Sequence, residues 1–488
     1  MNDINELKQK TLSGLFWRLG ERVLAQLVSF IVSIILARIL IPEQYGIVAI
    51  VTIFINIANV FVTSGLGTSL IQKKDADQLD FSTMFYSSVL LSICIYFVLF
   101  FIAPFIAKMY ENELLTSVIR IMGIKIPIAA VNSIQQAYVS NKMIYKKFFL
   151  STLLGTIISA VVGVTMALSG FGVWALVAQY LSNSFIDTVV LFITIDWRPT
   201  LEFSFKRFKQ LFSYGWKVMA TSLLGTIFDQ IRGLIIGVKY TSEDLAYNNK
   251  GEQIPSIISN NFKSVTESVI FSSISKVQND SVNVKRAFSR LLKTGSFAIM
   301  PILFGLSAVA ETLVKILLTD KWLFCVPYLR IVCIQQCFSI LNLINLQAIK
   351  AIGRSDISLK LEFIKKPLYI SIVLITMNIS PLAICVGNAI YSIIGLLINS
   401  YPNKKILNYS LIEQIKDVGG YIILALIMQL IVWLTGYINL NMYLLLILQI
   451  SIGSIFYIGI SKCLKLDSFE YLFNVLRDVL NQKKEVKK

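Results

Sequence analysis

Polar side chains recur at helical spacing inside otherwise apolar stretches of this chain, and their types suit the binding of a charged, hydroxyl-rich molecule. In the first stretch, Arg18, Arg22 and Gln26 follow one another at intervals of four residues and therefore share one helix face. Cations bind phosphate groups through charge-assisted hydrogen bonds, whereas amides and hydroxyls bind sugars. Such stripes predict a cationic cavity for an anionic substrate that carries sugars. The predicted cavity cations are Arg18, Arg22, Lys125, Lys217, Arg232 and Lys263, and the predicted polar lining is Gln26, Asn56, Asn59, Asn132, Gln136 and Asn260.

Carboxylates accompany the cations in the same stretches. A carboxylate inside an apolar helix is costly unless it is paired or used, so these residues are candidates for binding H⁺ or Na⁺ as a coupling ion. Asp229 is the preferred candidate because it lies in the middle of its stretch, close to Arg232. The other three candidates are Glu21, Glu252 and Glu267.

Each of these assignments has a structural alternative. Arg18, Glu21 and Arg22 can simply mark the polar edge of the first stretch, because Leu19 to Leu40 is already long enough to cross a bilayer. Asp229 and the cation three residues later can form a mutually neutralising pair. The Asn and Thr stripes can serve only to hydrogen-bond neighbouring helices.

The residues that usually build an active site are missing from the sequence. Histidine is absent, which removes the commonest general base and the commonest metal ligand. The six cysteines are scattered and are expected to be small apolar fillers. The sequence contains no phosphate-binding glycine loop and no pair of carboxylates at catalytic spacing. We therefore expect no enzyme activity, no metal site and no cofactor beyond a coupling ion.

The elements that hold the stripes are about fourteen apolar stretches, and most are long enough to span a membrane as a helix of about 20 residues. The mean hydropathy of +0.70 and the 56% content of hydrophobic residues are far above those of a soluble globular chain. We predict an all-α polytopic membrane protein. The predicted spans are residues 14–40, 44–70, 82–107, 114–136, 148–169, 171–195, 211–238, 244–271, 291–313, 325–349, 357–377, 380–400, 417–437 and 441–462.

The distribution of positive charge predicts the orientation of the spans. Lys and Arg gather in every second connection, for example at Lys142 to Lys147 and at Lys285 to Lys293, whereas the connections 169–172 and 438–442 carry none. Short positively charged loops stay in the cytoplasm, so both termini are predicted to lie inside the cell. The net charge of +17 is spread over these loops, which argues against a nucleic-acid-binding surface and for contact with anionic membrane lipids.

The two halves of the chain look like repeats of each other. Residues 13–18 (SGLFWR) correspond to residues 212–217 (FSYGWK), and Ile119-Arg120-Ile121 corresponds to Leu329-Arg330-Ile331. Internal repeats of this kind are typical of membrane transporters. The repeat predicts two pseudo-symmetric six-helix lobes followed by two C-terminal helices. The predicted segments are 1–195 (first lobe), 196–210 (cytoplasmic linker), 211–400 (second lobe), 401–463 (two further helices) and 464–488 (an amphipathic basic tail on the cytoplasmic leaflet).

Several motifs resemble those of a known family. The opening residues 14–46, with Leu36-Ala37-Arg38-Ile39-Leu40 and Pro42-Glu43-Gln44-Tyr45-Gly46, resemble bacterial polysaccharide transporters, as do residues 246–255 and 271–280. These transporters are Wzx-like members of the multidrug/oligosaccharidyl-lipid/polysaccharide flippase superfamily. The resemblance implies a flippase of the bacterial inner membrane that moves undecaprenyl-diphosphate-linked oligosaccharide repeat units by alternating access, for O-antigen, capsule or exopolysaccharide assembly. It also implies polysaccharide polymerases and glycosyltransferases as possible partners.

Two other functions stay open from the sequence. The first is an ion-coupled drug or metabolite antiporter of the same superfamily, which would prefer a more acidic cavity than the cations here provide. The second is a membrane glycosyl polymerase or ligase, for which large external loops with catalytic groups are expected. Most of the predicted external loops are short.

Overall fold

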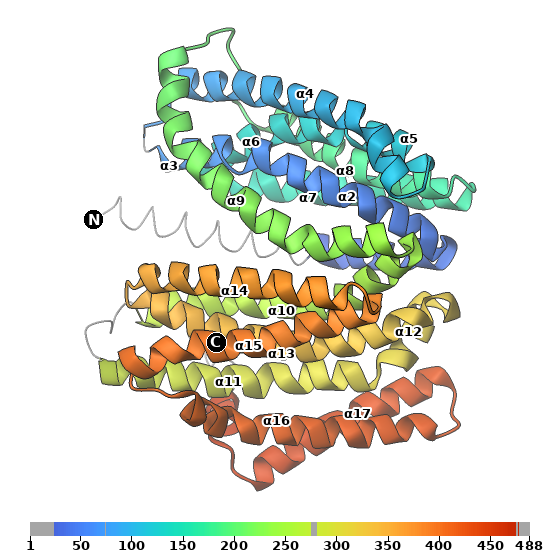
Figure 1. Ribbon diagram of the computed structural model, residues 1–488, viewed down its shortest axis with the longest axis vertical. Helices are drawn as coiled ribbons and strands as arrows, with labels where there is room; N and C mark the ends of the chain where they lie inside the picture. The colour runs from blue at the N-terminus through green and yellow to red at the C-terminus, as the bar shows by residue number, and fades with distance from the viewer. Residues whose placement is uncertain (1–23, 74, 275–280, 475–476, 478–488) are drawn as a thin grey trace, which may run out of the picture. The chain divides into compact units, whose positions relative to one another are not determined.

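The computed structural model describes residues 24–73, 75–274, 281–474 and 477, and all of its regular elements there are helices (Figure 1). The first helix covers Leu24–Ile39. The helices of the first half that follow are α2 (Pro42–Thr63), α3 (Leu66–Gln72), α4 (Gln78–Met109), α5 (Leu114–Met122), α6 (Lys125–Asn141), α7 (Tyr145–Leu168), α8 (Val173–Thr194) and α9 (Phe205–Lys239). The remaining helices are α10 (Ser242–Ile274), α11 (Ser281–Ala308), α12 (Ala310–Leu318), η1 (Asp320–Cys325), α13 (Val326–Ala351), α14 (Ser355–Thr376), α15 (Pro381–Ile406), α16 (Leu411–Leu434), η2 (Thr435–Tyr437) and α17 (Met442–Cys463).

The helices confirm the predicted fold class. Ten helical segments in the described chain are long and apolar enough to cross a membrane. Four more helices bring the total to the predicted fourteen: the shorter apolar helix Leu24–Ile39 and the more polar α9, α10 and α14. The protein is therefore an all-α, multi-span membrane protein.

Three predicted spans are interrupted in the structure, and one of them, 291–313, divides into α11 and α12 at Val309. The predicted span 44–70 divides into α2 and α3 at Ser64 and Gly65, and the predicted span 114–136 divides into α5 and α6 around Gly123. At Gly123 a β-carbon would lie 2.8 Å from the Ile119 carbonyl oxygen and 3.1 Å from the Tyr96 ring. The lack of a side chain at Gly123 therefore leaves the room that Tyr96 occupies at the break.

The chain forms two compact units, Met1–Ala246 and Tyr247–Lys488. In the first unit α7 packs along α8, while α9 packs on α2, α3 and α4. The repeat places α9 at the start of the second lobe, whereas its contacts place it with the first unit. The predicted lobe boundaries follow the repeat rather than the contacts, and they stay a prediction.

Glycines permit the close contact of α9 with the start of α3. A β-carbon on Gly215 would lie 2.8 Å from the Gly65 carbonyl oxygen, and one on Gly65 would lie 2.7 Å from the Gly215 carbonyl oxygen. Small residues at helix contacts let two backbones approach closely in a membrane protein. The contact between Gly65 and Gly215 therefore determines where α9 packs against α3.

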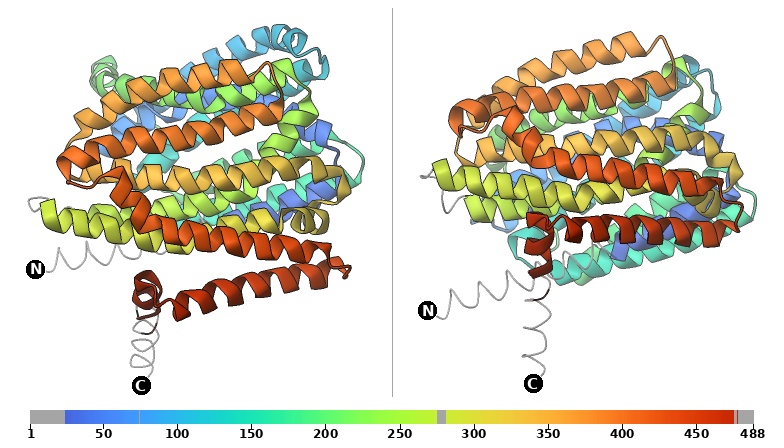
Figure 2. Two further views of the ribbon diagram at one scale, coloured as in Figure 1. Left: turned by 60° about the horizontal axis from the view of Figure 1, so that its bottom comes forward. Right: turned by 90° about the horizontal axis from the view of Figure 1, so that it is seen from below.

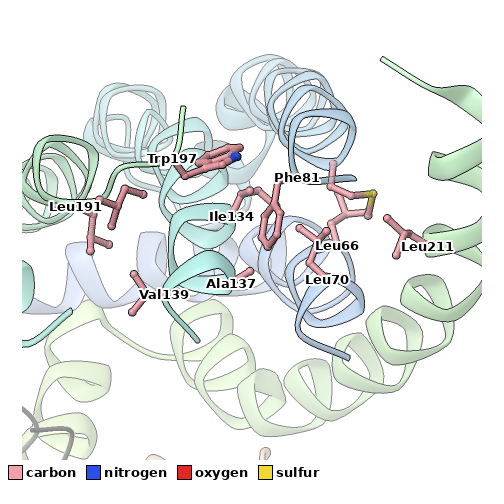
Figure 3. Packing of buried hydrophobic residues seen from close by; sticks show 11 residues of the cluster. Leu66, Leu70, Phe81, Ile134, Ala137, Val139, Leu191, Trp197 and Leu211 are labelled. Carbon is pink, nitrogen blue, oxygen red and sulfur yellow. The ribbon is translucent and has the colours of Figure 1, made fainter. Parts of the chain in front are cut away.

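One end of the first unit is closed by an apolar cluster (Figure 3). In this cluster the ring centroids of Phe81 and Trp197 lie 5.9 Å apart, and Leu66, Ile134 and Leu191 contribute from α3, α6 and α8. Trp197 belongs to the loop after α8, so the cluster holds this loop against the start of α4. The burial of these side chains positions the ends of four helices.

An ion-pair network reinforces the same end of the unit. Asp80, in the first turn of α4, is fully buried and lies 3.0 Å from the Arg207 guanidinium of α9. Lys73 pairs with the second oxygen of Asp80, and Asp77 lies 3.0 Å from Arg207. Asp77 caps α4 by accepting a hydrogen bond from the Asp80 N–H. Asp77 and Asp80 thus tie the beginnings of α4 and α9 together across 127 residues of sequence.

In the second unit, buried amides connect α13, α15 and α16. The Asn403 Nδ2 donates to Asn345 Oδ1 at 2.8 Å, and Asn345 Nδ2 donates to Gln414 Oε1 at 3.0 Å. A further hydrogen bond between α13 and α15 runs from Asn399 Nδ2 to Asn342 Oδ1 at 2.9 Å. Interhelical hydrogen bonds of this kind stabilise membrane helix bundles because lipid provides no competing partner.

The last two spans, α16 and α17, lie side by side, and a short helix follows α17 (Figure 2). Its described helical residues are 467–474 and 477. Phe469 packs against Phe297 of α11, and the Ser468 hydroxyl lies 2.8 Å from the Tyr421 hydroxyl of α16. The first turns of the predicted amphipathic tail therefore pack on the second unit, and residues 478–488 lie outside the described part.

Candidate functional site

A polar cavity of about 300 Å³ lies within the first unit, between α2, α3, α6 and α8. Asn132 and Gln136 of α6, Asn183 and Asp187 of α8, and Thr63 of α2 are among the residues that line it. Asp187 is the one titratable side chain in the described lining. Because the surrounding helices are membrane spans, this cavity places a carboxyl group in a setting where such groups are costly and usually functional.

The carboxyl group of Asp187 is held at the end of a directed chain of hydrogen bonds. Gln136 Nε2 donates to Asn132 Oδ1, and Asn132 Nδ2 donates to Asp187 Oδ2 at 3.0 Å. The other carboxyl oxygen, Oδ1, is buried without a hydrogen-bond partner in the described chain, and Ser151 of α7 lies beside the carboxyl group. Asp187 forms no ion pair within the described chain, in contrast to the buried Asp80. The amide chain therefore compensates part of the cost of burying this carboxyl group.

Close packing of α7 on α8 fixes the position of Asp187. A β-carbon on Gly155 would lie 3.1 Å from the Asn183 carbonyl oxygen and 3.3 Å from the Asp187 β-carbon. One turn along α7, Ser159 accepts a 3.3 Å hydrogen bond from Asn183 Nδ2. Asn183 and Asp187, four residues apart on α8, are thus held in place by α7. On the cavity side, Asn132 of α6 contacts Asp187.

Two of these residues were predicted from the sequence to line a binding site, and the third was not. Asn132 and Gln136 were predicted as polar lining, and the structure brings them together on α6. Asp187 was not singled out, although it lies within the predicted span 171–195, four residues after Asn183. The signal for Asp187 was a carboxylate that shares a helix face with an amide, Asn183, inside an apolar stretch. The same kind of signal identified the predicted coupling-ion candidates.

The other predicted residues of the first unit are spread along it. Lys217 and Asp229 are exposed on α9, whereas Arg232 is 8% exposed. Lys125 is the first residue of α6, and its ammonium lies 5.4 Å from the centroid of the Tyr180 ring. Of the remaining predicted lining, Gln26 is half-buried in the first helix, and Asn56 and Asn59 are half-buried in α2.

In the second unit, one predicted cation joins a polar chain. Lys263 Nζ lies 3.5 Å from Gln336 Oε1, and Gln336 Nε2 lies 3.4 Å from the Ser256 hydroxyl. Glu252 is half-buried and Asn260 is exposed on the same helix, α10.

A buried lysine on α10 was also missed. Lys250 is 7% exposed, lies 3.2 Å from Gln253 Oε1, and has its ammonium 5.6 Å from the centroid of the Trp322 ring. In the sequence it lies beside two asparagines in the predicted span 244–271 and inside the motif 246–255.

Four of the predicted site residues cannot be placed. Arg18, Glu21 and Arg22 lie outside the described residues, as does the side chain of Glu267. The prediction of one cationic cavity shared by the two halves therefore stays a prediction.

A family model described as "Polysaccharide biosynthesis protein" matches residues 35–327, which is more than half of the chain. The chain belongs to this family. The motifs at residues 36–40, 42–46, 246–255 and 271–280 that suggested polysaccharide transporters lie inside the matched region. The predicted resemblance is thereby confirmed.

Three curated relatives have names that agree with the family. The chain is 22% identical to a succinoglycan biosynthesis transport protein of Rhizobium meliloti, over 63% of this chain and 62% of the relative. It is 23% identical to a teichuronic acid biosynthesis protein of Bacillus subtilis, over 62% and 63%. Each of these matches spans less than two thirds of the relative's length. The chain is also 23% identical to the lipopolysaccharide biosynthesis protein WzxC of Escherichia coli, over 76% of this chain and 75% of the relative.

Two solved structures share the fold. The lipid II flippase MurJ in an inward closed conformation aligns with a TM-score of 0.73 at 15% identity, over 96% of this chain and 100% of that chain. An inward-facing multidrug resistance transporter of the MATE family, a member of the MOP superfamily, aligns with a TM-score of 0.56 at 14% identity, over 79% and 96%. The TM-scores show a common architecture. At such low sequence identity they say nothing about a common substrate.

Proposed function

We propose that this protein is a flippase that moves undecaprenyl-diphosphate-linked oligosaccharide repeat units across the bacterial inner membrane by alternating access. Family membership is the observation that carries the proposal, because the relatives above are named for succinoglycan biosynthesis transport and for lipopolysaccharide biosynthesis. The MurJ-like fold agrees with a lipid-linked substrate. The charged headgroup and sugars would cross through the protein while the prenyl chain stays in lipid.

The polar groups inside the spans provide the chemistry that such a substrate needs. Asn132 and Gln136 offer amides to sugar hydroxyls, and Lys263 offers a cation to a phosphate group. We include Arg18, Arg22 and the other predicted cavity cations in the proposed diphosphate site. Asp187 joins Asp229, Glu21, Glu252 and Glu267 as a proposed site for a coupling H⁺ or Na⁺, because it is an intramembrane carboxyl group without an ion-pair partner in the described chain.

Topology and partners belong to the same proposal. The alternating basic loops support a cytoplasmic location for both termini, so that the lipid-linked substrate would enter from the leaflet where it is made. Polysaccharide polymerase and glycosyltransferases would act after and before the flippase on the same lipid-linked intermediate. No chemical step on the substrate is assigned to this chain.

A deletion strain provides the test. Without the gene, lipid-linked repeat units should accumulate on the cytoplasmic leaflet, and surface polysaccharide should fall to background. Complementation with Arg22→Ala should restore little polysaccharide at a normal membrane level, because loss of one charge-assisted contact lowers diphosphate affinity about ten- to a hundredfold. Arg22→Lys should restore part of it, and Ile34→Ala should behave as wild type. Normal surface polysaccharide in the deletion strain, with no second transporter present, would refute the proposal.

Export of a cationic drug or metabolite is the second candidate. It is favoured by the MATE-like fold and by the cavity around Asp187, whose described lining contains a carboxyl group and no cation. Wild-type resistance to cationic drugs in the deletion strain, together with loss of surface polysaccharide, would exclude it.

A further inference from the structure

A second cavity, of about 320 Å³, lies in the second unit between α11 and the helix that follows α17. We call it the basic cavity. Its cations come from one face of α11, at Arg286, Arg290 and Lys293, and the opposite wall is formed by Ser468 and Tyr471. Asp467 is the one acidic residue in the described lining.

The carboxylates of α16 neutralise only some of the cations on α11. Lys285 lies 3.0 Å from Glu413, and Lys293 lies 3.1 Å from Asp417. Asp417 is further held by hydrogen bonds from the Ser289 and Tyr409 hydroxyls. Glu413 and Asp417 therefore form ion pairs with the two lysines.

The two arginines between the lysines have no carboxylate within ion-pairing distance in the described chain. Arg286 donates to Asn283 Oδ1 at 3.2 Å, and the Arg290 guanidinium lies 5.5 Å from the centroid of the Tyr471 ring. Both arginines are exposed and border the same cavity. Each guanidinium group presents a fork of N–H donors, and two such groups a single helical turn apart suit the oxygens of a phosphate group.

We propose that the basic cavity binds the phosphate headgroup of an anionic glycerophospholipid such as phosphatidylglycerol. The cavity is at the polar beginning of a span, where the phosphates of the bilayer are the most abundant anions. Beside it, Tyr471 and Phe473 are 45% and 57% exposed, which provides aromatic and apolar surface next to the headgroup position. Tyrosine is favoured at this depth of a membrane because one end of it is apolar and the other is polar.

Lipid binding would strengthen the attachment of the final helix to α11 within the second unit. The bound phosphate would bridge α11 and the helix at residues 467–474, adding to the contacts of Phe469 with Phe297 and of Ser468 with Tyr421. The inference does not depend on the transported substrate. A protein that binds anionic lipid here but fails the polysaccharide test above would overturn only the proposed function.

The test uses the full-length protein in detergent, with native mass spectrometry during titration by phosphatidylglycerol or phosphatidylcholine. The wild type should bind phosphatidylglycerol in preference to phosphatidylcholine. The variant Arg286→Gln/Arg290→Gln should lose that preference, with an affinity for phosphatidylglycerol about tenfold lower or more. Arg286→Lys/Arg290→Lys should keep an intermediate affinity, because lysine retains the charge but not the fork.

A matched control removes two cations from another helix end. Lys404→Gln/Lys405→Gln acts on the last turn of α15, where the Lys405 ammonium lies 5.5 Å from the centroid of the Tyr401 ring. Its affinity for phosphatidylglycerol should stay within about twofold of the wild type. Equal losses in both double variants would show non-specific attraction and overturn the proposal.

Two further outcomes would also overturn it. Wild-type affinity for phosphatidylglycerol in the arginine double variant would show that the cavity does not hold this lipid. Arginine-dependent binding of inorganic pyrophosphate, with no lipid preference, would identify a site for a soluble anion instead. Thermal unfolding of each variant, compared with the wild type in the same detergent, separates a lost site from a lost fold.

Discussion

Asn132 Nδ2 lies 3.0 Å from Asp187 Oδ2, so that a single hydrogen bond joins α6 to α8 inside the membrane-spanning part of the first unit. Asp187→Asn keeps the size of this side chain and removes its charge and its titration. If the carboxyl group binds a coupling ion, transport in vesicles should lose its dependence on the ion gradient and fall about tenfold or more at a normal protein level.

The control for this prediction is Asp196→Asn, two residues after the end of α8. Asp196 is 92% exposed and forms a 3.3 Å ion pair with Lys147, which is worth little in water. Transport by this variant should match that of the wild type. Wild-type gradient dependence in Asp187→Asn would leave Asp187 with a structural role only.

The amide of Asn132 should contribute to stability through both of its partners. Asn132→Leu leaves Asp187 Oδ2 and Gln136 Nε2 without their hydrogen bonds. The free energy of unfolding should fall by about 1–3 kcal/mol, as expected when a buried polar group loses its partner. In a double-mutant cycle, Asp187→Leu should cost less in the Asn132→Leu background than in the wild type; additive losses would contradict the coupling.

The buried carboxylate of Asp80 should matter more for folding than its exposed neighbour. Asp80→Asn weakens the pairs with both Lys73 and Arg207 in a fully buried position, and we expect a loss of about 1–3 kcal/mol in the free energy of unfolding. Asp77→Asn should cost about 1 kcal/mol or less, because Asp77 is half exposed. Chemical denaturation in detergent would measure both values. Equal losses would contradict the argument that the burial of Asp80 makes its ion pairs more important than those of Asp77.

Asp77 should also give the protein a specific sensitivity to acid. The hydrogen bond from the Asp80 N–H, followed by the Arg207 guanidinium, holds the pKa of Asp77 below its usual value of 3.8. A lowered folded-state pKa means that this stabilisation is complete above pH 3.8 and is lost as the pH falls through the lower folded-state value. The difference in Tm between the wild type and Asp77→Asn should therefore shrink as the pH is lowered from 5 towards 3. A difference that grows towards acid would contradict this sign.

The glycine contact between α3 and α9 provides a matched pair of substitutions on one helix. Gly215→Ala would place a β-carbon 2.8 Å from the Gly65 carbonyl oxygen, and overpacking should cost about 1–3 kcal/mol. Gly225→Ala, ten residues further along α9, meets open space and should be neutral or stabilising by up to about 1 kcal/mol. Thermal unfolding of the two variants checks the prediction, and a reversed order would show that α9 does not rest on Gly65.

Much of the architecture could be predicted from the sequence because bilayer thickness and backbone hydrogen bonding constrain it strongly. A segment in lipid must satisfy its own backbone, so each long apolar stretch had to be a helix, and its length could be counted. The breaks at Gly65 and Gly123 could not be located in this way. At both breaks the glycine lies close to a partner distant in sequence, Gly215 or Tyr96, which hydropathy does not reveal.

The sequence by itself also determined that polar groups lie within the membrane, and it placed Asn132 and Gln136 on one helix face. Only the tertiary structure decided that Asp187 of α8 meets them, because a pairing across 55 residues depends on how α6, α7 and α8 pack. In the same way, spacing along α11 identified its cations, but the positions of Glu413 and Asp417 on α16 decided which were neutralised and which, Arg286 and Arg290, were not. Periodicity is a property of one helix, whereas a site requires the distances between several.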